Sequence, residues 1–122
     1  MAPDGIDRET AHVIAEIQTK LLSQIRPEAI LLFGSAARGD ARLDSDLDLL
    51  VVWDERQDLP NIKRQILLRR LIGSINRPLD LLTCSSQELK DSLRKANPFT
   101  AEIVKEGVVL YGGLDEPSRL DN

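Results

Sequence analysis

Three aspartates in apolar surroundings are the residues of this chain best suited to chemistry. Asp46 and Asp48 open the segment 46–53, and Asp80 lies within the apolar run 79–82. Residues two apart on a strand point to the same face, so the Asp46 and Asp48 carboxylates should lie side by side. Two carboxylates in a poorly solvated place repel each other, and a divalent cation would relieve that cost. Mg²⁺ suits such a pair because it prefers oxygen ligands and is often shared with a substrate phosphate.

Asp80 can reach the same place if its strand neighbours the strand that carries Asp46 and Asp48. Three carboxylates on adjacent strands can hold two cations about 3.5–4 Å apart and bracket a phosphoryl transfer. Taken one at a time, each aspartate is better explained as a solvated residue at the entrance of a strand, because a bare Asp-x-Asp pair is common. The chemistry therefore depends on whether the fold brings the three together.

Gly34 and Ser35 form a second candidate element, directly after the apolar run 29–33. Glycine permits a sharp turn where the strand ends, and the N–H groups of a turn opened by Ser35 can point at an anion. A routine Gly-Ser turn is the alternative, and a Walker A loop is excluded because no Gly-Lys-Ser/Thr follows. Arg38 and Arg42 are either solvated or in reach of phosphate oxygens, and we favour a phosphate role for Arg38.

The elements that must position these residues follow from hydrophobic periodicity and turn residues. Apolar spacing predicts helices over 7–25 and 60–75, and capping signals predict shorter ones over 85–95 and 97–106. In the 60–75 helix the apolar stripe runs from Ile62 and Ile66 to Ile75, and Arg64 is expected mostly off it. Strands are predicted over 29–33, 46–53, 78–83 and 108–111. Three aromatic residues are expected in the core rather than as base-stacking platforms: Phe33, Trp53 and Phe99.

Alternating strands and helices indicate an α/β (α+β) fold, with a small mixed β-sheet and helices packed around it. The connection between the first two strands is too short for a crossover helix, so that pair should be antiparallel. The segment 46–53 is apolar on one whole face and partly apolar on the other, which favours a central strand. We expect one domain over residues 1–111 and a flexible tail over 112–122.

Composition excludes several classes of function for this chain of 122 residues. One cysteine and one histidine cannot form an internal disulfide or a Cys/His zinc site. A hydrolase triad would have to run through His12, which no nearby serine or cysteine supports. A net charge of −4 argues against a general nucleic-acid coat. The lack of a long apolar stretch or a basic leader makes a cytoplasmic protein the expectation.

Taken together, the motifs resemble a known family. Leu32-Phe33-Gly34-Ser35-Ala36-Ala37-Arg38-Gly39, continued by Ser45-Asp46-Leu47-Asp48-Leu49, is similar to the signature of the polymerase-beta-like nucleotidyltransferases. Within this family, the chain is most similar to the minimal nucleotidyltransferase (MNT) group. Members of that group are often encoded beside a HEPN-domain protein. Asp80 matches the third acid of that signature, and the segment 102–111 is similar to the group's C-terminal segment. The resemblance covers roughly residues 10–111.

This resemblance implies a role for each motif residue. Gly34 and Ser35 would grip the triphosphate of a nucleotide. Asp46 and Asp48 would hold Mg²⁺, with two ions expected, and Asp80 would complete one metal site and help to deprotonate an acceptor hydroxyl. That hydroxyl would attack the α-phosphate of ATP, and pyrophosphate would leave.

Three functions follow from the resemblance. The first is an antitoxin that transfers AMP to a HEPN-domain toxin and silences it, because the chain has no length left for an acceptor domain of its own. The second is a binding module that neutralises its partner by docking, with a weak or inactive site. The third is a stand-alone transferase that acts on a small molecule, such as an aminoglycoside, or on RNA ends.

Overall fold

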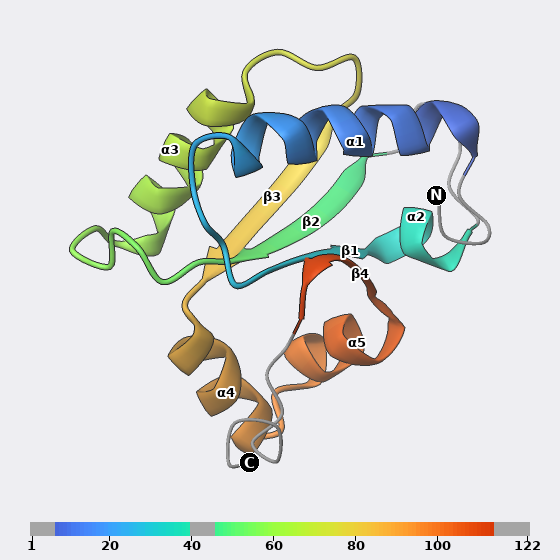
Figure 1. The fold of residues 1–122 in the computed structure, drawn as a ribbon. Coiled ribbons are helices and arrows are strands. Elements are labelled where there is room, and N and C mark those ends of the chain that lie inside the picture. Colours follow the sequence, from blue (N-terminus) through green and yellow to red (C-terminus); the bar gives the residue numbers. More distant parts are fainter. Residues whose placement is uncertain (1–6, 40–45, 114–122) are drawn as a thin grey trace.

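The computed structural model describes residues 7–39 and 46–113, and in these ranges every predicted helix and strand is present (Figure 1). The boundaries differ from the predicted ones by at most three residues. The turn expected at Gly34 and Ser35 takes the form of a short helix, Gly34–Arg38. The elements are, in chain order, α1 (Arg8–Leu22), β1 (Ala29–Phe33), α2 (Gly34–Arg38), β2 (Leu47–Val52), α3 (Asn61–Ile72), β3 (Leu79–Cys84), α4 (Ser86–Arg94), α5 (Pro98–Glu106) and β4 (Val108–Gly112).

The four strands form one mixed sheet in the order β3-β2-β1-β4. β1 is antiparallel to both β2 and β4, and β2 is parallel to β3. This confirms the antiparallel first pair and the mixed sheet, and it confirms β2 as an inner strand. The β2–β3 register also sets Asp48 directly beside Asp80, because these two residues are partners in the parallel ladder.

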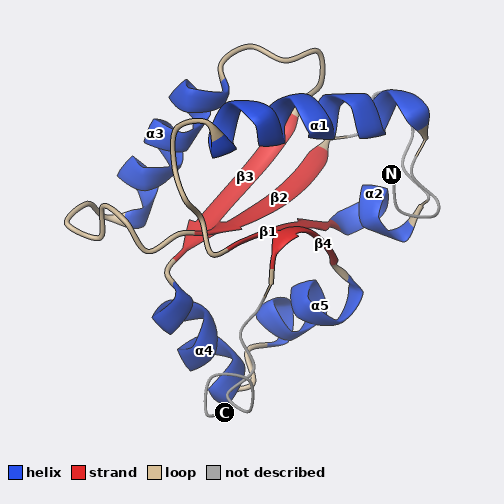
Figure 2. Cartoon of the chain, in the orientation of Figure 1, coloured by secondary structure: helices blue, strands red, loops and turns tan. Residues whose placement is uncertain are grey.

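One face of the sheet is covered by α1 and α3, which lie together on the same side (Figure 2). The strands contribute inward residues at every second position, as the alternation of a pleated strand requires. Along β2 these are Leu47, Leu49 and Val51, all fully buried. They pack against α1 residues such as Ile17 and α3 residues such as Leu68, forming the larger of two apolar clusters.

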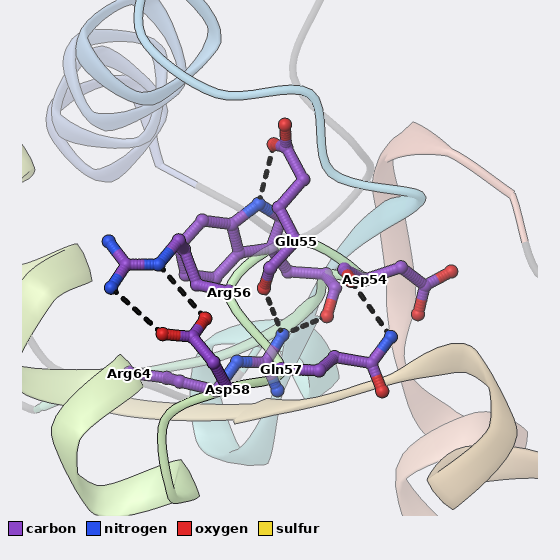
Figure 3. Close-up of polar contacts among 7 residues, drawn as sticks. Asp54, Glu55, Arg56, Gln57, Asp58 and Arg64 are labelled. Carbon is purple, nitrogen blue, oxygen red and sulfur yellow. Dashed lines mark hydrogen bonds and ion pairs between the residues drawn. The ribbon is translucent and has the colours of Figure 1, made fainter.

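The expected face of α3 was partly wrong. Ile62 and Ile66 are exposed, whereas Arg64 is 1% exposed and lies among the buried residues. The Arg64 guanidinium lies 5.1 Å from the centre of the Trp53 ring and donates hydrogen bonds to the main-chain oxygens of Trp53 and Glu55 (Figure 3). The cation–π contact and the carbonyl acceptors compensate for burying the charge, and they tie α3 to the turn after β2. This turn also carries a surface ion pair between Arg56 and Asp58 (Figure 3).

The other face of the sheet is covered by α4 and α5 (Figure 1). The capping box predicted at the start of α4 is confirmed, with Ser85 and Glu88 bonded reciprocally. Leu89 and Ile103 anchor the two helices in a smaller apolar cluster beneath the sheet. This cluster leaves the end of β2 that carries Asp48 uncovered.

The remaining predictions on the chain's organisation fall partly outside the described residues. β4 continues to Gly112, one residue into the segment expected as a flexible tail, and residues 114–122 of that segment lie outside the described ranges. The segment 40–45, which includes Arg42, also lies outside them. Across residues 7–39 and 46–113, no helix is long and apolar enough to cross a membrane.

Candidate active site

Asp48 and Asp80 meet at the open end of the β2–β3 pair. Their carboxyl groups lie within hydrogen-bonding reach of each other, and the Asp46 carboxylate is close enough to act on Asp48 through its charge. Asp48 is partly buried, whereas Asp46 and Asp80 are exposed. The fold therefore brings Asp48 and Asp80 together, and Asp46 acts on Asp48 through its charge.

The environment of Asp48 disfavours its negative charge. Burial raises the pKa of its carboxyl, and the charges of Asp80 and then Asp46 raise this pKa further. The charge of Arg38 acts in the opposite direction but is the weakest of these influences. A carboxylate under such strain is stabilised by a nearby cation, and groups of this kind gather at functional sites.

Gly34 lies against the Asp48 carboxyl group. Its φ of +74° belongs to the left-handed region, and a Cβ built on it would overlap Oδ2 of Asp48. Two independent constraints thus require glycine at this position: the turn from β1 into α2 and the close approach of the carboxylate. The sequence suggested only the first of these.

The helix α2 is short, Gly34–Arg38, and its start lies beside the Asp48 carboxyl group. Within the described residues no side chain caps this turn, so its first N–H groups are left for another acceptor. Ser35, half-buried, sits at the second position of the turn, and Arg38 ends it. The positive end of this short segment therefore lies beside the negative charges of the aspartates.

A cleft of about 280 Å³ opens between α2, the ends of β2 and β3, and α5. Arg38 and Glu106 approach across it, with 4.0 Å between the guanidinium Nη1 and the carboxylate Oε1. Asp46 and Ser35 stand next to this cleft rather than in its wall. The residues that line it are Phe33, Gly34, Arg38, Asp48, Asp80, Phe99, Glu102, Ile103 and Glu106.

The α5 wall of the cleft was missed by the sequence reasoning. Phe99 was expected in the core, yet 53% of its surface is exposed and its ring lines the cleft. Glu102 and Glu106 were assigned no role. Their spacing of four residues places them on one side of a helix, which is the signal that could have linked them to a common surface.

The acids suit a hard divalent cation by chemistry, because carboxylate oxygens are the ligands that Mg²⁺ prefers and their mutual repulsion is what a cation offsets. As they stand, however, no three His, Cys, Asp or Glu side chains in the described part of the chain are grouped closely enough to form a complete ligand set. The donor set therefore fits a metal that completes its coordination with substrate oxygens or water.

The overall fold of this chain is similar to that of two solved structures. A protein from Sulfolobus solfataricus assigned to the nucleotidyltransferases matches with a TM-score of 0.52 and 24% identity, over 83% of this chain and 75% of that one. A chain from the structure of a toxin–antitoxin with AMP-PNP matches with a TM-score of 0.54 and 25% identity, over 81% and 73% of the two chains.

The model of the family "Polymerase beta, Nucleotidyltransferase" matches residues 15–115. The chain belongs to this family. None of the curated proteins matches its sequence significantly. The fold class expected from the sequence is thereby confirmed by the structure and by its solved relatives.

Proposed function

We propose that this chain is the antitoxin of a HEPN/MNT pair and that it transfers AMP from ATP to a hydroxyl of its toxin partner. The observation that carries the proposal is the Asp48–Asp80 pair, held side by side by the β2–β3 register at the floor of an open cleft. The charge of Arg38, in the wall of the same cleft, offsets the repulsion between these carboxylates only in part. Here the charges remain in conflict, as the raised pKa of Asp48 indicates.

In the proposed site, one group of residues would hold the metal and another would bind the nucleotide. Asp46, Asp48 and Asp80 would hold Mg²⁺, with two ions expected, and the N–H groups at Gly34 and Ser35 would receive the triphosphate. When bound, the metal supplies neutralisation of phosphate charge and a lower pKa for the attacking hydroxyl. Arg38 would add a charged donor at the α2 side of the cleft.

Residues of the chain itself would accept the proton of the acceptor hydroxyl and position the reacting groups. Asp48 and Asp80 both line the cleft, and Asp80 is the more exposed of the two. Asp80 accepts the proton of the acceptor hydroxyl. The hydroxyl oxygen then forms its bond to the α-phosphorus, the bond to the bridging oxygen breaks, and pyrophosphate leaves. Such transfers depend on positioning and charge stabilisation more than on a protein nucleophile.

The partner assignment is supported by similarity. One solved structure that this chain resembles is that of a toxin–antitoxin with AMP-PNP. The HEPN-domain identity of the partner is what the resemblance of the motifs implies.

Mass spectrometry tests the proposal directly. The candidate toxin, a HEPN-domain protein that the proposal expects to be encoded beside this one, is incubated with the chain, ATP and Mg²⁺, and a mass gain of one or more AMP units is expected. Asp80→Asn should lower the rate by about 10²–10⁴-fold, because it removes the proton acceptor. Asp58→Asn is the matched control, since Asp58 is an exposed aspartate paired with Arg56 outside the cleft.

Two other outcomes would contradict transfer to the toxin. A stable complex without a mass gain, in which Asp80→Asn still neutralises the toxin, would make the chain a docking module. Label from ATP that appears on RNA or on a small molecule, and not on the protein partner, would make it a stand-alone transferase.

A further inference from the structure

Phe99 is held at a fixed place at the start of α5. Asn97 caps this helix by accepting the N–H of Thr100 at 3.1 Å, and Pro98 occupies the first turn. The hydroxyl groups of Ser92 and Thr100, 2.6 Å apart, join the start of α5 to α4. The backbone that carries the Phe99 ring is therefore fixed by a cap and by a neighbouring helix.

The Phe99 ring is the largest apolar surface exposed in the cleft. Its exposure of 53% contrasts with 9% for Phe33, although both line the same cleft. The two rings meet edge to face, with centroids 6.0 Å apart and planes at 85°. Such a contact covers at most one face of either ring, so Phe99 retains an open aromatic face.

The charges of the cleft divide it into two sides. The α2 side presents the guanidinium of Arg38, which suits phosphate and lies 4.0 Å from the Glu106 carboxylate. The α5 side presents Glu102 in addition to Glu106, so its net charge is negative and disfavours phosphate. A nucleoside triphosphate consists of a polyanion and a flat neutral base, so its phosphates belong at α2 and its base at α5.

We propose that Phe99 forms the nucleobase subsite of this cleft, with the base of the incoming triphosphate stacked on its open face. The inference rests on the proposed function in that it takes a nucleoside triphosphate as the ligand. Every base has a π face, so stacking on a phenyl ring supplies affinity with little discrimination between bases. Phe99 is therefore a determinant of nucleotide affinity, separate from the acids that carry the chemistry.

The test compares a ligand that has a base with one that lacks it. Calorimetry with Mg²⁺ measures the binding of AMP-PNP and of inorganic tripolyphosphate to the wild-type chain and to Phe99→Ala. The variant should lose about five- to hundredfold in affinity for AMP-PNP, the range expected for loss of one base stack, and keep its affinity for tripolyphosphate. Val109→Ala is the matched control, because Val109 is 49% exposed on β4 and lies outside the cleft wall.

A second variant gives a readout that does not depend on truncation. Phe99→Trp should preserve the affinity for AMP-PNP and place an indole in the cleft. Its fluorescence should then be quenched by AMP-PNP and not by tripolyphosphate. The single native tryptophan, Trp53, is 2% exposed and provides the unquenched background.

The outcomes separate this inference from the proposed function. The base subsite would be overturned if Phe99→Ala kept its affinity for AMP-PNP, or if it lost affinity for AMP-PNP and tripolyphosphate equally. It would also be overturned if, in the AMP-transfer assay, Phe99→Ala raised only the KM for the acceptor. A wild-type chain that binds AMP-PNP through Phe99 but transfers no AMP would overturn the proposed catalysis and leave the subsite standing. A wild-type chain that binds neither ligand would overturn both.

Discussion

The two faces of the sheet are built for different tasks. The face under α1 and α3 is closed: the inward residues of β2 are fully buried, and even the charge of Arg64 is enclosed by Trp53 and main-chain oxygens. The face under α4 and α5 is closed only in its middle, where Leu89 and Ile103 pack. At its edge it leaves an aromatic ring and several carboxylates open to a cleft.

This contrast indicates where stability and activity are located in a domain of this size. The larger of the two apolar clusters lies on the closed face, so more of the stabilising apolar burial is located there. The cleft face carries features that oppose folding, such as the strained charge of Asp48 and the exposed ring of Phe99. Natural proteins keep such features where function requires them. Substitutions on the closed face should therefore mainly lower stability, whereas substitutions at the cleft should mainly lower activity.

The largest effect on stability is expected on the closed face. Leu49→Ala removes a fully buried side chain from the centre of β2 and should lower the free energy of unfolding by about 2–5 kcal/mol. Val109→Ala, a smaller truncation at a site 49% exposed on β4, should cost about 0.5 kcal/mol or less. Urea denaturation followed by circular dichroism measures both. Equal costs would show that the two faces do not differ as described.

An intermediate effect is expected at Gly34, where the two tasks meet. Gly34→Ala places an alanine at positive φ and should cost about 1–3 kcal/mol of stability. Its Cβ would also displace the Asp48 carboxyl, and a displacement of that order should lower AMP transfer about 100-fold.

Gly73→Ala is the matched control for this substitution. Gly73 has φ +71°, and no atom lies within 4 Å of the place that a Cβ would occupy, so alanine there meets backbone strain alone. This variant should lose stability and keep its activity, measured by the AMP-transfer assay. If both variants lose activity equally, the contact between Gly34 and Asp48 is not what the site requires.

The sequence predicted the elements well because their signals are local. Apolar runs gave each strand within two residues, and the Ser85/Glu88 spacing gave the cap of α4, since a capping box is made within one turn. The short β1–β2 connection gave the antiparallel pair. Asp48 and Asp80 could be matched only by assuming that their strands are neighbours, and the parallel ladder supplied that fact.

The errors concern contacts between residues distant in the chain. Arg64 was placed off the apolar stripe because arginine is seldom buried, and only the position of Trp53 against α3 explains its burial. Phe99 was placed in the core because aromatic residues are usually buried. Its exposure depends on how far α5 stands from the end of β2, which no local pattern encodes.

An effect smaller than those at Leu49 and Gly34 is expected at the start of α1, on the closed face and away from the cleft. Asp7 caps this helix by accepting the N–H of Thr10 at 2.8 Å, and this hydrogen bond lowers the pKa of its carboxyl. Asp7→Ala should cost about 1 kcal/mol at neutral pH and leave AMP-PNP affinity unchanged.

The pH dependence of this cap sharpens the prediction. Because the folded-state pKa lies below the ordinary value of 3.8, the charge-dependent part of the stabilisation is complete above that pH. It is lost as the pH falls through the lowered pKa. Asp7→Asn retains a capping oxygen without the charge, so its smaller cost should vanish at low pH. Urea denaturation at a series of pH values measures both variants. The two faces would be coupled if the loss of stability in these variants grew as the pH fell, or if either variant bound AMP-PNP more weakly.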